Sequence, residues 1–370
     1  MISVKAPDHY WNEPDILLKS GPLIAPYGKN AFVVTGQKAL NAVGHAFFES
    51  LKQAGIAHTI ASFGGKVTIA EIEVYTAQAS AQQADVIIGV GGGKALDLAK
   101  AVGGKLRLPV IAVPTIAATC ASWAAVSILY DDLGRSSEYL MNERSPALVL
   151  VDTRVIASAP KRYLASGIGD TIVKWYEIAV NLSEESGELD IQIAGQTAKL
   201  ALDRLRSHAL AAYETAGSGK VTPALTETIN DIIVLAGLAG TVQGSKPRAA
   251  IAHAIHNSLT FVHQTSDTLH GEKVAFGLLA QTVLEGRAGD EIDELAVWLH
   301  SFGLPITLRG LGITGDSASI TLEIAKRVQL REDATTGLAF AVNEASLAEA
   351  IQQADQWGQR IQQESVYANS

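Results

Sequence analysis

Four histidines in this chain lie close enough together in sequence to do chemistry as a group. His253, His256, His263 and His270 all fall within the segment AHAIHNSLTFVHQTSDTLHGEK. His253 and His256 are three residues apart, so a helix would place them on nearly the same face, whereas His270 opens the next element beside a glycine. Two of the four histidines could therefore share one ligand.

Asp170 supplies a carboxylate for the same chemistry. It lies in GIGDTIVKWYE, among residues that otherwise have core character. A buried carboxylate is costly unless it is paired or bound to a cation. An aspartate with two histidines is a zinc-type ligand set that leaves one position open for substrate. The pattern predicts a metal centre, and a hydrogen-bonded core role for each single histidine is the competing interpretation.

Three consecutive glycines form a second candidate site. Gly91, Gly92 and Gly93 stand in DVIIGVGGGKALDLAK, between a run typical of a buried strand and the apolar spacing of a helix. Without side chains, their amides can approach an anion at the positive end of that helix. The spacing matches neither GxGxxG nor the P-loop. The motif therefore predicts phosphate binding without naming the ligand, with a plain tight turn as the alternative.

The elements that must position these residues change character along the chain. Runs typical of strands recur at 31–36, 58–63, 85–90, 109–115 and 147–152, with helical patterns between them. Such alternation predicts a doubly wound parallel sheet whose ligands bind at the carboxyl ends of the strands. After about residue 155 the periodicity is helical. We expect an α/β dinucleotide-binding domain over 1–155 and an all-α metal- and substrate-binding domain over 156–370.

Composition narrows the classes of partner. The formal net charge of −9 and the lack of a basic cluster argue against nucleic acid and anionic membranes. No apolar stretch approaches the roughly 20 residues of a membrane span, and the N-terminus lacks a signal-peptide core. The single cysteine, Cys120, excludes an intrachain disulfide and a cysteine-based zinc cluster. We expect a cytoplasmic protein with a small-molecule substrate.

Four motifs together carry a family resemblance. GVGGGKALDLAKAV, VPTIAATCASW, VDTRVIASAPKRYLASGIGD and HAIHNSL…LHGEKVAFG resemble the glycerol dehydrogenase branch of the metal-dependent alcohol dehydrogenases. The resemblance implies a catalytic cleft between the domains and a homo-oligomer, either a dimer or an octamer. It also implies zinc, or another divalent metal, on Asp170, His253 and His270, with His256 near the site.

The resemblance further implies a nicotinamide cofactor, NADP or NAD, bound by the first domain. The positions that would bind it are Gly36, Gly92, Gly93, Lys94, Ala95, Leu96, Asp97, Thr115, Ile116, Ala117, Ala118, Val126 and Tyr130.

Three positions depart from the family pattern. Cys120 stands where glycerol dehydrogenases have an aspartate that contacts the polyol, and Gly36 stands where NAD-using relatives have an aspartate for the ribose. Lys174 occupies the position of a further histidine in iron-binding relatives. The pattern TIAATCASW together with GIGDTIVKWYE looks closer to the hydroxycarboxylate dehydrogenases, a subgroup of the family that reduces 2-oxo acids with NADPH. We therefore expect Lys174, His256 and Cys120 to act at the catalytic site.

Other functions remain open at this point. Glycerol, or another polyol, is the alternative substrate. A sugar-phosphate cyclase or glycerol-phosphate dehydrogenase would need a basic pocket, which the sequence does not display. The alternative outside the enzymes is a related protein that binds the nicotinamide cofactor and catalyses no reaction.

Overall fold

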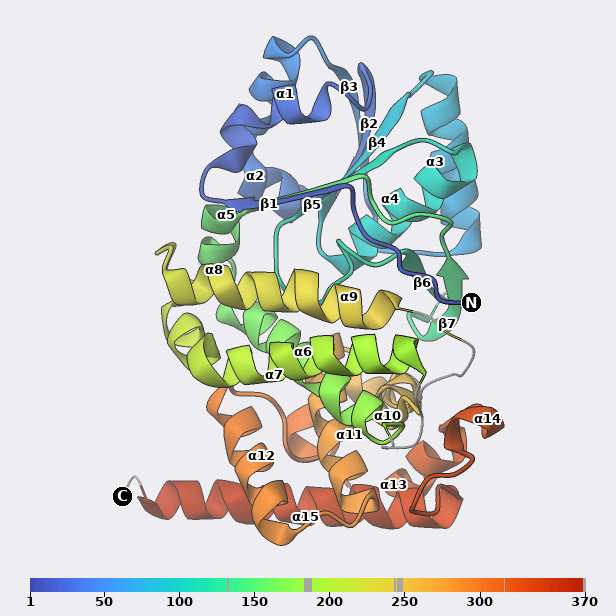
Figure 1. Cartoon of the computed structure of the whole chain (residues 1–370), viewed down its shortest axis with the longest axis vertical. Helices are drawn as coiled ribbons and strands as arrows, with labels where there is room; N and C mark the ends of the chain where they lie inside the picture. The colour runs from blue at the N-terminus through green and yellow to red at the C-terminus, as the bar shows by residue number, and fades with distance from the viewer. Residues whose placement is uncertain (132, 183–187, 243, 245–248, 316, 369–370) are drawn as a thin grey trace. The chain divides into compact units, whose positions relative to one another are not determined.

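The structure, a computed structural model, describes residues 1–131, 133–182, 188–242, 244, 249–315 and 317–368 (Figure 1). These residues divide into two compact units. The sheet unit comprises the described residues of Ser3–Leu164 and Arg204–Gln243, and the helical unit those of Met1–Ile2, Ala165–Asp203 and Gly244–Ser370. The units thus alternate along the chain, while the domain boundary at residue 155 stays a prediction.

Six parallel strands form the centre of the sheet unit. Their spatial order is β1-β8-β5-β4-β2-β3, and every hydrogen-bonded neighbour runs parallel. The strands are β1 (His9–Glu13), β2 (Asn30–Thr35), β3 (Ala57–Ser62), β4 (Val86–Gly91), β5 (Val110–Pro114) and β8 (Leu148–Asp152). Five of them coincide with the runs expected from the sequence, so the parallel α/β architecture is confirmed.

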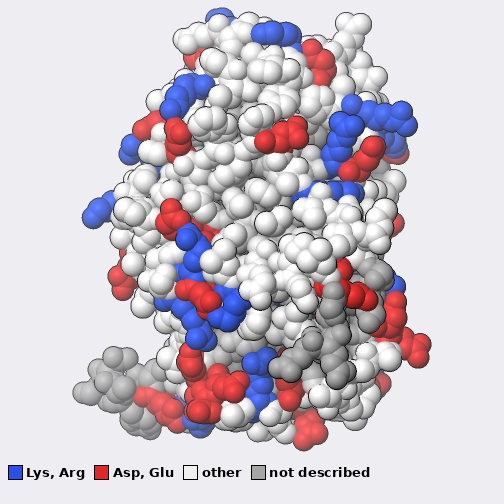
Figure 2. Space-filling model, in the orientation of Figure 1, with Lys and Arg blue, Asp and Glu red and all other residues white. Residues whose placement is uncertain are grey.

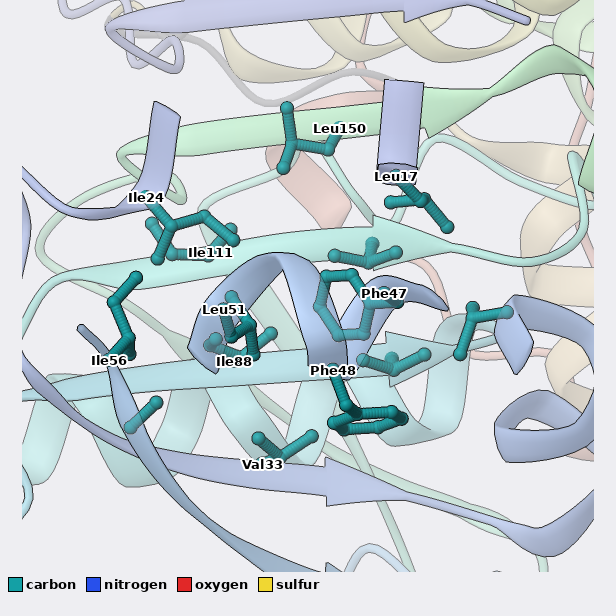
Figure 3. Packing of buried hydrophobic residues seen from close by; sticks show 14 of the residues in the cluster. Leu17, Ile24, Val33, Phe47, Phe48, Leu51, Ile56, Ile88, Ile111 and Leu150 are labelled. Atoms are coloured by element: carbon teal, nitrogen blue, oxygen red, sulfur yellow. The ribbon is translucent and has the colours of Figure 1, made fainter. Parts of the chain in front are cut away.

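Helices cover both faces of this sheet. Helices α1 (Ser20–Ile24) and α2 (Gln37–Gln53) lie on one face, and α3 (Ile69–Ala81) and α4 (Gly93–Leu106) lie on the other (Figure 1). Ile88 packs with Phe47 and Leu51 of α2 (Figure 3), whereas its neighbour Ile87 packs with Leu98 of α4. Successive strand residues point to opposite faces, so a strand apolar at every position needs cover on both sides.

Three strands were not predicted from the sequence. The edge strand β1 mixes polar and aromatic residues and pairs only with β8, so it lacks the apolar run of a central strand. β6 (Val126–Tyr130) and β7 (Ser136–Met141) form an antiparallel hairpin outside the main sheet. The turn between them includes Gly134 at φ +79°, a conformation typical of glycine in turns. The glycine in DDLG was a usable turn signal.

Every regular element described after β8 is a helix, which confirms the all-α character expected there. The helices are α5 (Thr153–Ser158), α6 (Lys161–Ala179), α7 (Leu189–Thr215), α8 (Pro223–Asn230), α9 (Ala236–Thr241), α10 (Ile251–Leu259), α11 (His270–Leu284), α12 (Gly289–Ser301), α13 (Ser317–Arg327), α14 (Glu332–Thr335) and α15 (Glu344–Ala368). A π-helical turn (Asp231–Leu235) joins α8 to α9, and 3₁₀ turns occupy Ile16–Lys19, His263–Thr265 and Arg309–Leu311.

Charged side chains of both signs are scattered over one face of the molecule (Figure 2). On the face that Figure 2 shows, lysines and arginines stand in small groups, many of them beside aspartates and glutamates. Among the described residues, no helix combines the length and the apolar character that crossing a membrane requires.

Candidate metal and cofactor sites

Asp170, His253 and His270 converge in the helical unit. Their ligand atoms all lie within 4.8 Å of one another. The Nε2 atoms of His253 and His270 lie 3.3 and 3.5 Å from Oδ1 of Asp170. The three residues come from α6, α10 and α11, so residues a hundred positions apart in the chain form one cluster. One carboxylate with two imidazoles fits a divalent metal such as zinc.

Close contact between α6 and α11 brings His270 to Asp170. A Cβ added at Gly271 would lie 1.8 Å from the carbonyl oxygen of Ser166, so only glycine permits this approach. The amide of Gly271 donates to Oγ of Ser166 at 3.1 Å. Glu272 accepts from the amide of Leu269 at 2.7 Å and thereby begins α11 at His270. The close packing of α6 and α11 therefore explains why glycine follows His270.

Lys174 brings a cation into the same cluster. Its Nζ lies 3.0 Å from Oδ1 of Asp170 and 3.3 Å from Nε2 of His253. Its side chain is 16% exposed, and the i,i+4 spacing on α6 aligns it with Asp170. The structure thus brings Lys174 beside the candidate ligand atoms, while a part in catalysis stays a prediction.

The charges of the cluster keep Asp170 ionised. Burial opposes ionisation, but the nearby Lys174 ammonium and the contacts with the two imidazoles outweigh it, so the pKa of Asp170 lies well below its usual range. The carboxylate therefore stands ready to bind a cation. Burial lowers the pKa of the His270 imidazole, which favours the neutral form that binds metals.

His256 orients His270. Nδ1 of His256 faces Oδ1 of Asn257 at 3.0 Å, and its Nε2 faces Nδ1 of His270 at 3.1 Å. Burial holds the pKa of His256 well below its usual value, so the ring is neutral. Since its Nδ1 donates to Asn257, its Nε2 accepts from His270, which leaves the Nε2 lone pair of His270 facing Asp170. This geometry supports an orienting role for His256.

Glu177 orients His253 in the same way. One carboxylate oxygen accepts from the ring Nδ1 of His253 at 2.7 Å, and the other accepts from its backbone amide at 2.9 Å. Glu177 is only 5% exposed. Glu177 was not among the site residues predicted from the sequence. Its position seven residues after Asp170, on the same face of α6, was the available signal.

Glu177→Gln should weaken zinc binding by about 10- to 100-fold, the usual cost of removing a carboxylate that orients a metal-binding histidine. The amide is neutral and no longer raises the basicity of the ring. Isothermal titration of the metal-free protein with zinc measures the effect. Glu323→Gln is the control, because Glu323 pairs with Arg327 on the exposed side of α13. Equal affinities in the two variants would contradict the role of Glu177.

The glycine turn lies where the parallel sheet ends. Thr35 of β2 stands opposite Val90, and Gly91 stands opposite Pro114 of β5. Gly36, Gly92 and Thr115 therefore leave the sheet at one edge. Gly92 precedes α4, so the amides of its first turn lack helical acceptors and can face an anion. This geometry supports a phosphate site.

The other expected cofactor positions lie around this turn. Ile116 covers Gly92, since its Cδ1 lies 2.8 Å from the position a Cβ would take there. Nζ of Lys94 lies 4.5 Å from the centre of the Tyr130 ring, and burial lowers the pKa of Lys94. Ala95, Leu96 and Asp97 follow in the first turns of α4, Ala117 and Ala118 in the loop after Thr115, and Val126 opens β6. Their contact with a cofactor stays a prediction.

Asp97 has partners inside the protein. Its carboxylate pairs with Lys100 at 2.8 Å and accepts from the amide of Ile128 at 3.2 Å. The buried Lys100 ammonium also donates to the carbonyls of Ala121, Ala124 and Val126. This pair holds the loop after β5 against α4. Lys100 was not predicted from the sequence, and its i,i+3 spacing from Asp97 was the available signal.

Cys120 belongs to the loop after β5, in the sheet unit. Its side chain is half-buried. The catalytic part expected for Cys120, like those of Lys174 and His256, stays a prediction.

Comparisons with known proteins agree with this architecture. Residues 7–153 match the family described as iron-containing alcohol dehydrogenase. The glycerol dehydrogenase of Pseudomonas putida is 34% identical over 363 residues, which cover 97% of this chain and 98% of that protein. Hydroxycarboxylate dehydrogenase A of Escherichia coli K12 is 36% identical over 288 residues, 78% of this chain and 76% of that one.

A solved structure extends the similarity to the whole fold. The crystal structure of glycerol dehydrogenase from Schizosaccharomyces pombe matches with a TM-score of 0.88 at 29% identity, covering 99% of this chain and 93% of that one. The resemblance and the fold class expected from the sequence are therefore confirmed. The chain belongs to the iron-containing alcohol dehydrogenase family and is an oxidoreductase of its glycerol dehydrogenase-like branch.

Proposed function

We propose that the protein transfers hydride between NAD(P)(H) and a short 2-hydroxy or 2-oxo acid at a metal held by Asp170, His253 and His270. The observation that carries the choice of an acid is the Lys174 ammonium, 3.0 Å from Oδ1 of Asp170. A cation beside the metal ligands favours an anionic substrate. Cys120 works in the same direction, because it replaces a carboxylate that suits polyols.

The metal supplies Lewis acidity, which polarises a carbonyl and lowers the pKa of a hydroxyl. The residues of the chain supply orientation. Glu177 and His256 hold the two imidazoles with their Nε2 atoms toward Asp170. With both rings preset, little reorganisation accompanies metal and substrate binding.

Glycerol oxidation is the second candidate. It is favoured by the glycerol dehydrogenases that match this chain over nearly its full length. The two candidates differ in the charge of the substrate, so one assay separates them.

The test is reduction of short straight-chain 2-oxo acids, of dihydroxyacetone and of glycolaldehyde by the zinc-loaded protein, with NADPH and NADH supplied separately. We expect the highest kcat/KM with a 2-oxo acid. A higher kcat/KM for dihydroxyacetone, with glycerol oxidised in reverse, would select the polyol function. No turnover of any of these would favour a non-catalytic role.

Gly36 should permit NADPH, because it places no acid at the end of β2 where a 2′-phosphate would be repelled. Its φ of −92° suits any residue, and an added Cβ would meet nothing closer than 3.7 Å. Gly36→Asp should therefore fold normally. It should shift the ratio of kcat/KM values toward NADH by roughly tenfold or more through charge repulsion.

Gly36→Asn is the matched control for this change. It adds a side chain of the same size and the same capacity to cap α2, but no charge. If both variants keep the cofactor preference of the parent protein, the ribose is recognised elsewhere.

A cytoplasmic location, expected from the composition, and a dimeric or octameric state, implied by the resemblance, complete the proposal. Sedimentation of the purified protein tests the assembly.

A further inference from the structure

The candidate metal centre already contains a cation that belongs to the chain. Nζ of Lys174 lies within hydrogen-bonding reach of two of the three ligand residues, Asp170 and His253. Lysine can only donate, so Nε2 of His253 accepts from it, and the ring proton sits on Nδ1, facing Glu177. The lone pair that the ammonium uses is therefore the lone pair that a metal needs.

The ammonium and a divalent metal cannot use these atoms together. A zinc ion bonds to carboxylate oxygen and imidazole nitrogen at about 2.0–2.2 Å. Oδ1 of Asp170 and Nε2 of His253 are 3.3 Å apart, and the ammonium stands about equally far from both. A metal bonded to both atoms would lie against the ammonium, with a double positive charge facing a single one in a largely buried setting.

We propose that Lys174 is an internal cation that takes the place of the metal in the unloaded site and must leave Asp170 and His253 before a divalent metal binds. The inference depends on the metal site of the proposed function. It adds that metal binding exchanges the Lys174 ammonium for the metal ion. The free energy of metal binding is therefore the difference between the interaction of the metal and that of the ammonium with the Asp170 carboxylate. It also gives the displaced ammonium a new partner, the carboxylate of an acidic substrate.

The exchange predicts that Lys174→Met binds zinc roughly 10- to 100-fold more tightly than the parent protein, since the metal no longer displaces a charge-assisted hydrogen bond. Competition with a chelator of known affinity, at one pH, measures both dissociation constants. Lys199→Met is the matched control, because Lys199 and Asp203 also form an i,i+4 pair, but an exposed one on α7. It changes the net charge equally and should leave zinc affinity unchanged.

Thermal unfolding gives a second readout that does not depend on activity. Without its ammonium, the buried Asp170 carboxylate should destabilise the metal-free variant, and zinc should raise its Tm more than it raises that of the parent protein. Lys174→Gln serves if the methionine variant fails to fold, because the amide removes the charge and keeps a donor.

The outcomes separate this inference from the metal site itself. Tighter binding in the Lys174 variant that is lost again on adding His270→Ala supports the exchange. Equal or weaker binding, still dependent on His270, overturns the exchange and leaves the metal site standing. Absence of zinc binding in the parent protein and in the Lys174 variants overturns both.

Discussion

His270→Ala is expected to abolish zinc binding and nearly all activity while leaving the fold intact. Three protein ligands leave no redundancy, so the loss of one removes the site. Polarisation by a metal contributes several kcal/mol, and 1.4 kcal/mol corresponds to a factor of ten, so kcat/KM should fall roughly a thousandfold or more. Metal analysis of the purified variant, circular dichroism and turnover measure the three effects. Asp170→Asn and His253→Ala should behave alike.

His263→Ala is the control for this prediction. His263 belongs to the same histidine-rich segment, but its side chain is exposed in a 3₁₀ turn and takes no part in the three-residue cluster. It should keep full zinc and full turnover. If His270→Ala also keeps both, the ligand assignment is wrong.

Lys174→Met should lower kcat/KM for a short 2-oxo acid by about one to two orders of magnitude. That range corresponds to the roughly 1.5–3 kcal/mol of a hydrogen bond to a charged group. An uncharged aldehyde of similar size should lose little, because it has no carboxylate for the ammonium to bind. The assays need saturating zinc, since this substitution also changes metal affinity. The ratio of the two kcat/KM values is the decisive measurement.

Lys174→Arg sharpens the comparison. Arginine keeps the charge, so it should retain part of the preference for the acid, although its planar group will not fit the position of an ammonium fully. An equal fall for acid and aldehyde in Lys174→Met would mean that Lys174 supports the structure of the site and does not recognise a carboxylate.

The candidate ligands were visible in the sequence because each carries a local anomaly. Asp170 is a charge in an apolar helix, and His253 and His270 belong to an unusual density of histidines. Residues alone did not say which two histidines join Asp170. The family resemblance named His253 and His270, and the structure brings these two to Asp170. His256 contacts a candidate ligand and is not one itself, because its Nε2 faces His270 and not the carboxylate of Asp170.

The sequence by itself determined the parallel α/β sheet, the helical remainder and the glycine turn at the end of β4. These features follow from periodicities and short motifs, which depend on residues close together in the chain. The edge strand β1 and the hairpin strand β7 were not predicted because they lack the apolar run of a central strand, whereas VSILY of β6 was a strand signal that was not used.

Only the tertiary structure decided what each polar group of the site faces. Glu177 is far from His253 in the sequence. Its carboxylate contacts the His253 ring because α6 packs beside α10. The approach of α11 at Gly271 places His270 against Asp170, and the same packing leaves Lys174 beside the ligand atoms. Such partners are set by distances of a few ångströms between helices that are far apart in the chain. Helical periodicity tells which face of a helix is apolar but not which neighbour it meets.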